Sequence, residues 1–115
     1  MEFDESMFVL VTFVPPAETE QVLAALFAAG AGVYGAYDHC AFVSPGEGRF
    51  RPLAGSSPFI GTVGEDERVA ENRIELLVPD SAVDQVLQAL RQSHPYEEPA
   101  IYLYPLDSRA LKSRE

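Results

Sequence analysis

The chain has little of the chemistry that marks several large classes of protein. Its 115 residues contain a single cysteine, Cys40, which excludes an internal disulfide and a zinc site built from several thiolates of one chain. Basic residues are also few, because eight Lys and Arg stand against eighteen Asp and Glu, for a net charge of −10. Such a surface repels phosphate backbones, so we expect no nucleic-acid partner.

Targeting and membrane signals are lacking as well. Residues 1–5 are acidic where a secretion signal would be basic, and no apolar run approaches the length that crosses a bilayer. The basic residues of the tail, Arg109, Lys112 and Arg114, are too few to form a binding arm. We therefore expect a cytoplasmic protein with no membrane partner.

What the chain does have is a regular apolar pattern over nearly its whole length. The apolar fraction is 47%, and a chain of this size buries roughly two-thirds of its unfolded surface. We expect one domain over residues 1–115, with a core of about 6–106 and a short polar tail at 107–115.

The periodicity alternates between strand and helix patterns. We expect strands at residues 7–14, 35–43, 68–78 and 100–106, and helices after Pro15-Pro16 and from about Asp80 to Ser93. This order predicts an α+β fold, a ferredoxin-like βαββαβ sandwich with both helices on one face of the sheet. The other face would combine the charges of the third strand with either Ile101 and Leu103 or Tyr102 and Tyr104. Such a mixture is typical of a face covered by a partner, and self-association is the expected cover.

Residues 44–67 are rich in Gly, Pro and Ser and form a long excursion between the second and third strands. Its length predicts a hairpin or a packed segment. Two interpretations stay open. The excursion is a lid or subunit-embracing hairpin in which Arg49 and Arg51 meet an anion or an acidic neighbour. Alternatively, it is a loop held to the body by its own Phe50, Phe59 and Ile60.

The segment His-Pro-Tyr-Glu-Glu-Pro-Ala, residues 94–100, places polar groups on a stiff turn before the last strand. Its prolines stop the preceding helix near Ser93. His94 then lies at a helix C-terminus, where the dipole favours the imidazolium and opposes metal ligation. Glu97 and Glu98 are consecutive and should diverge. We expect no catalytic residues within one chain.

Both histidines of the sequence are potential metal ligands. His39 and Cys40 are adjacent, and neighbouring side chains of a regular strand point to opposite faces, so they should not share one ion. His39 and His94 remain the candidate metal ligands, and a divalent metal ion is the candidate cofactor, with no complete ligand set.

Several strings occur here in a characteristic order. These are GAGVYGAYDHCAF, GEGRFRP, GSSPFIG, the Glu71-Asn72-Arg73-Ile74-Glu75 strand and HPYEEPA. Together they resemble the PII/CutA-like domain of the YqfO-like family, over about residues 7–106. In that family the domain is an insertion in larger proteins and also exists as a short stand-alone protein. CutA proteins look similar through a related His-Pro-Tyr segment.

The resemblance implies a ferredoxin-like fold that assembles as a trimer and binds small effectors or metal ions between subunits. Full-length YqfO-like proteins hold a dinuclear metal site in a flanking core, which this sequence lacks. We therefore expect a non-enzymatic, regulatory homo-oligomer with a small-molecule effector. The alternative is a metal-dependent hydrolase, or an accessory subunit of a cyclohydrolase-like dinuclear-metal protein. The expected binding surface comprises Tyr37, His39, Glu71, His94, Tyr96 and Glu97.

Overall fold

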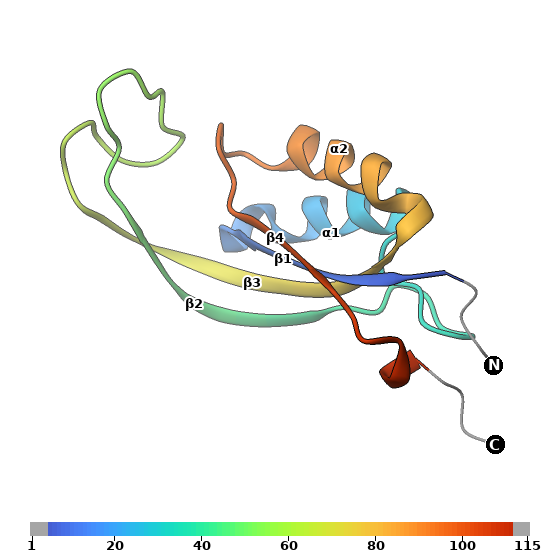
Figure 1. Ribbon diagram of the computed structural model, residues 1–115. Coiled ribbons are helices and arrows are strands. Elements are labelled where there is room, and N and C mark those ends of the chain that lie inside the picture. Colours follow the sequence, from blue (N-terminus) through green and yellow to red (C-terminus); the bar gives the residue numbers. More distant parts are fainter. Residues whose placement is uncertain (1–4, 112–115) are drawn as a thin grey trace.

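A computed structural model describes residues 5–111 as a four-stranded antiparallel sheet with two α-helices packed against one face (Figure 1). The sheet order is β2-β3-β1-β4, which is the expected ferredoxin-like arrangement. The elements are β1 (Met7–Val14), α1 (Thr19–Ala28), β2 (Phe42–Phe50), β3 (Glu67–Pro79), α2 (Val83–Ser93) and β4 (Ile101–Pro105).

The core lies between the sheet and the two helices. Alternate residues of β1 and β3, such as Leu10 and Ile74, face the helices and are fully buried. Leu26 of α1 and Leu90 of α2 meet them from the other side. Because β1 pairs with β3 on one edge and β4 on the other, its nearly continuous apolar sequence matches its central place.

Strands β2 and β3 continue past the body as a long hairpin, which we call the arm (Figure 1). Their pairing runs from Phe42 opposite Glu75 to Phe50 opposite Glu67. Residues 51–66, which we call the arm loop, connect the two strands at the far end. The arm contributes to an elongated molecule of 55 × 24 × 23 Å, and it confirms the expected hairpin excursion.

The second strand differs from the expectation at residues 35–43. It begins only at Phe42, and the preceding segment is an irregular loop. Tyr34 and Tyr37 exchange backbone hydrogen bonds across a tight turn, and His39 adopts a left-handed φ of 53°. Local turn geometry thus replaces the first part of the expected strand. The strand instead runs into the glycine-rich segment, where β2 tolerates Pro45 because it is an edge strand.

The sheet face away from the helices, which we call the open face, carries the tyrosines of β4. Ile101 and Leu103 pack against the core, while Tyr102 and Tyr104 are exposed. The ring of Phe13 meets Tyr102 edge to face at 5.7 Å between centroids. This outcome settles which of the two β4 residue sets faces outward.

The end of the described chain folds back onto the body. Residues Ser108–Leu111 form a 3-10 helix, and Leu111 is buried. The basic tail residues Lys112 and Arg114 and the N-terminal residues 1–4 lie outside the described residues. Within residues 5–111, no helix is long and apolar enough to cross a membrane.

Candidate functional site

Residues 94–100, the polar turn, begin where α2 ends. The last helical residue is Ser93, and His94 has the extended backbone that a following proline favours. Its N–H still donates to Leu90 O at 2.9 Å, so His94 closes the last turn of α2. The prolines therefore end the helix where the sequence predicted and aim the chain toward β4.

The His94 side chain is 6% exposed and both of its ring nitrogens are occupied. Nδ1 accepts the N–H of Tyr96 at 3.1 Å, so it carries no proton. Nε2 must then donate to the carbonyl oxygen of Phe13 at 2.7 Å. Neither nitrogen offers a free lone pair, so His94 holds the polar turn in shape instead of facing a ligand.

Burial lowers the pKa of His94 below its usual 6.5. The hydrogen bond to Phe13 and the negative charges of Glu71 and Glu18 act in the opposite direction but are outweighed. The expectation that the helix dipole would favour the imidazolium is therefore wrong. Desolvation of a ring with 6% exposure is the larger effect.

Tyr96 reaches from the polar turn to strand β3. Its hydroxyl donates to Glu71 Oε2 at 2.8 Å. Burial, followed by this bond and the charge of Glu71, raises the pKa of Tyr96 and keeps the phenol protonated. Gly48 on β2 makes room for this pair, because a Cβ at position 48 would collide with the Glu71 carboxylate.

The arm and its loop are attached to the polar turn by a hydrogen bond and by ring contacts. The backbone N–H of Ser57 donates to Glu97 Oε1 at 2.8 Å. The rings of Phe50 and Phe59 lie 6.5 and 6.2 Å from that of Tyr96, centroid to centroid. The aromatic residues of the excursion thus contact the body, as one of its two interpretations required.

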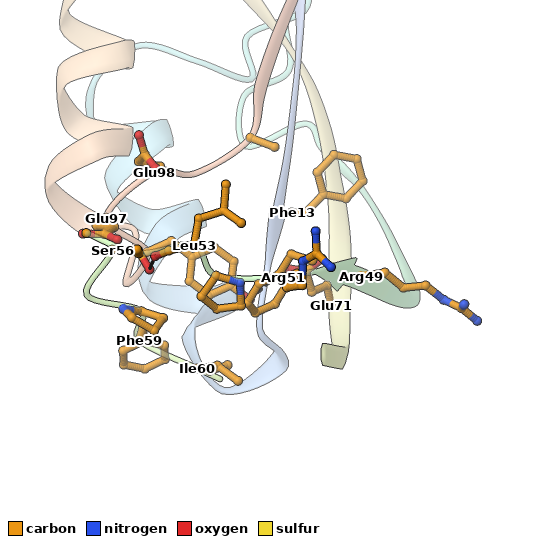
Figure 2. A pocket seen from close by; sticks show the side chains of 17 residues that line it. Phe13, Arg49, Arg51, Leu53, Ser56, Phe59, Ile60, Glu71, Glu97 and Glu98 are labelled. Atoms are coloured by element: carbon orange, nitrogen blue, oxygen red, sulfur yellow. Dashed lines mark hydrogen bonds between the residues drawn. The ribbon is translucent and has the colours of Figure 1, made fainter. Parts of the chain in front are cut away.

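Between the arm loop and the polar turn lies a pocket of about 740 Å³ (Figure 2). This volume is within the range of small-molecule sites, and the lining combines aromatic, aliphatic and charged groups. The lining residues are Phe13, Arg49, Phe50, Glu71, Tyr96, Glu97, Glu98 and Ala100, together with 51–56 and 58–60 of the arm loop.

The six residues of the expected binding surface fall into two groups. Glu71, Tyr96 and Glu97 line the pocket, with His94 directly beside Tyr96. Tyr37 and His39 lie near the other end of α1, where the His39 ring stacks on Phe27 at 4.5 Å between centroids. Within one chain the structure therefore brings together four of the six.

The described residues offer no preformed metal site, since no three His, Cys, Asp or Glu side chains among them are grouped around one point. Cys40 follows His39 in the irregular loop, and its thiol lies 3.6 Å from the carbonyl oxygen of Asp38. The assumption that His39 and Cys40 belong to a regular strand was wrong. Both remain without a third ligand in the described part of the chain.

Sequence reasoning did not place Phe13, Leu53 and Ser57 in this site. Phe13 reaches it from the end of β1, and Ser57 contributes a backbone N–H that no sequence pattern encodes. A signal existed for the arm loop in its alternation of glycines with Phe50 and Phe59. That pattern predicted anchoring but not the partner, which is Tyr96.

Comparison with known proteins places the chain among larger relatives. No protein-family model matches it. It is 50% identical over 102 residues to a GTP cyclohydrolase 1 type 2 homolog of Halalkalibacterium halodurans, covering 89% of this chain and 27% of the relative. A Bacillus subtilis protein of the same name is 52% identical over 98 residues, which is 85% of this chain and 26% of the relative. The chain thus spans about a quarter of the length of these relatives.

Solved structures agree with this result. A Bacillus cereus protein related to NIF3 superposes with a TM-score of 0.79 at 45% identity, covering 91% of this chain and 27% of that one. CutA from Synechococcus elongatus superposes with a TM-score of 0.64 at 22% identity, covering 96% and 86%. The second likeness shows the fold alone. Both results confirm the resemblance drawn from the sequence motifs.

Proposed function

Because the chain is homologous to one region of the YqfO/NIF3-like proteins and has a CutA-like fold, we propose that it is an effector-binding domain. In this proposal it is non-enzymatic, regulatory and oligomeric, and it acts in the cytoplasm. The pocket between the arm loop and the polar turn is the observation that carries the proposal. The glycine-rich arm loop contacts Tyr96 and Glu97 there, so an occupant of the pocket touches both the arm loop and the polar turn.

Self-association is supported by the open face and the arm. Tyr102 and Tyr104 are 44% and 54% exposed on the open face, and Phe42 at its β2 edge is 65% exposed. Aromatic residues gathered in this way are typical of the centre of a protein interface. A homotrimer is the assembly that the family resemblance favours.

An oligomer would also explain why the expected binding residues divide into two groups. Tyr37 is 74% exposed and lies at the end of α1 remote from the pocket. It can share a site with Tyr96 and Glu97 only across a subunit boundary. We therefore assign Glu71, Tyr96 and Glu97 to one subunit's half of the site, and Tyr37 and His39 to a neighbour's half.

The alternative, a metal-dependent hydrolase, gains no support from the described residues. The relatives are named for a cyclohydrolase, but this chain spans about a quarter of their length. No three potential ligands are grouped within residues 5–111. A small effector, or a single metal ion completed by neighbouring subunits, fits the pocket better than a resident catalytic centre.

Light scattering during gel filtration and calorimetric titration with nucleotides and divalent metal ions test this function. We expect an oligomer that binds at least one of these probes, and at least about tenfold weaker binding by Glu97→Ala. Glu20→Ala, which removes an exposed carboxylate of α1, should bind as the unmodified chain does. A monomer that binds nothing, with Glu97→Ala lowering only the free energy of unfolding, would contradict the proposal.

A further inference from the structure

The charged groups of the pocket suggest the chemical class of its ligand. Arg51 and Arg49 both line it, but Arg49 is paired with Glu47 at 2.9 Å. Arg51 makes no ion pair or hydrogen bond to any other residue between 5 and 111. The N–H groups of its planar guanidinium are therefore free to donate two parallel hydrogen bonds to a carboxylate.

Free acceptors are also present on the opposite side of the pocket. Glu97 uses Oε1 for the N–H of Ser57, while its second oxygen has no partner in residues 5–111. Glu98 forms no hydrogen bond or ion pair in the same part of the chain. In Figure 2 both glutamates lie well apart from Arg51, with Leu53 between them in this view.

These positions disfavour a ligand with charge of one sign only. An anion bound at Arg51 would face Glu71, Glu97 and Glu98 in a chain of net charge −10. A simple cation would leave Arg51 without a counter-charge. A ligand that carries a carboxylate at one end, an ammonium group at the other and apolar groups between them satisfies both sides of the pocket. The rings of Tyr96, Phe50 and Phe59 offer the apolar surface.

We propose that this pocket binds a short zwitterionic peptide with apolar side chains, with its C-terminal carboxylate on Arg51 and its N-terminal ammonium on Glu97 and Glu98. A single α-amino acid carries both charges on one carbon and could not reach both sides of the pocket. The inference rests on the proposed effector-binding function and names the class of effector. Binding of this ligand would bridge the arm loop and the polar turn. Those two segments are otherwise joined by one hydrogen bond and by ring contacts in the described chain.

Calorimetric titration of the full chain with three related probes tests the charge pattern. We expect leucyl-phenylalanine to bind at least about tenfold more tightly than its N-acetylated form, which lacks the ammonium, and than leucyl-phenylalaninamide, which lacks the carboxylate. Free phenylalanine, whose two charges share one carbon, should also bind at least about tenfold more weakly than the dipeptide. Equal affinity for leucyl-phenylalanine and its blocked forms, or no binding of the dipeptide at millimolar concentration, would overturn the inference.

Two variants assign the contacts to residues. Arg51→Gln should abolish the preference for leucyl-phenylalanine over its amide, and Glu97→Gln combined with Glu98→Gln should abolish the preference over the acetylated form. Arg91→Gln removes the same charge from the exposed surface of α2 and should change neither preference. If nucleotides or metal ions bind while zwitterions do not, this inference fails and the proposed function stands. If the chain is monomeric and no probe of any class binds, both fail.

Discussion

At the scale of single residues, His94 joins three separate segments through its backbone N–H and its two ring nitrogens. Its N–H is bound to α2, Nε2 to the carbonyl oxygen of Phe13 in β1, and Nδ1 to the N–H of Tyr96. A second proton would place a donor on Nδ1 opposite the Tyr96 donor. Protonation therefore breaks the bond that shapes the polar turn.

This arrangement predicts a pH-dependent stability. The pKa of His94 is lowered in the folded protein, so the unfolded chain binds more protons as the pH falls below about 6.5. The contribution of His94 to stability is complete above that pH and is lost on acidification toward the lower, folded pKa. Urea unfolding from pH 7.5 to 5 should show a steeper loss of unfolding free energy for the unmodified chain than for His94→Gln. Parallel curves for His94→Gln and the unmodified chain would contradict this role of His94.

The hydroxyl of Tyr96 should contribute measurably to stability. Tyr96→Phe keeps the ring among Phe50 and Phe59 but removes the hydroxyl that donates to Glu71 Oε2, so a partly buried carboxylate oxygen loses this hydrogen bond. We expect a loss of about 1–2 kcal/mol in the free energy of unfolding, measured by urea denaturation. Tyr104→Phe, at an exposed hydroxyl of the open face, should cost less than about 0.5 kcal/mol. Equal losses in the two variants would show that the Glu71 bond adds nothing.

At the scale of elements, two glycines distinguish the cost of a left-handed backbone from the cost of steric crowding. Gly32 and Gly55 both have positive φ, at 83° and 95°. A Cβ at Gly32 would lie 2.9 Å from the Cys40 carbonyl oxygen and from a ring carbon of Phe27, while a Cβ at Gly55 meets nothing within 4 Å.

The alanine variants at these two positions should therefore differ. Gly55→Ala should cost about 1–2 kcal/mol for the left-handed backbone alone. Gly32→Ala should cost at least about 1 kcal/mol more, because α1 and the loop before β2 must move apart. Thermal or urea unfolding of both variants provides the measurement. If the two variants lose the same free energy of unfolding, the close packing of Phe27 on this loop does not contribute to stability.

Most elements were predictable because their apolar periodicity and their proline boundaries agree. β1 occupies the expected residues 7–14, β3 and β4 differ by a residue at each end, and α2 ends at Ser93 as expected. The strand predicted at residues 35–43 was wrong over most of its length, and the error has a physical cause. Aromatic residues there favour a strand, but the turn between Tyr34 and Tyr37 and the left-handed His39 satisfy the backbone locally.

The site was less accessible to prediction because its contacts are tertiary. Consecutive polar groups made residues 94–100 conspicuous, yet nothing in the sequence tells which strand Tyr96 will reach. The Glu71 partner follows only from the register of β2 and β3 and from the space left by Gly48. The pocket also depends on the fold of the arm loop, whose spacing of glycines and phenylalanines does not specify a path.

At the scale of the whole molecule, the open face should decide the assembly. Tyr102→Asp places a charge among Tyr104, Phe13 and the other exposed rings, and burying that charge in an interface is costly. We expect this variant to be a folded monomer in light scattering where the unmodified chain is an oligomer. Gln88→Asp adds the same charge to the exposed side of α2 and should leave the assembly intact. An oligomeric Tyr102→Asp protein would exclude this face as the contact.

The backbone hydrogen bond from Leu106 N to Met7 O, 2.9 Å long, has a consequence for engineering. It holds the beginning of β1 beside the end of β4, while the pocket lies at the other end of β1, at Phe13. A short linker between residues 106 and 7 could therefore close the chain for circular permutation, with new ends opened in the exposed stretch near Gly64. By the same geometry, the domain can be spliced into a surface loop of a host protein whose two attachment points are neighbours. A reporter joined between residues 106 and 7 would stand clear of the pocket.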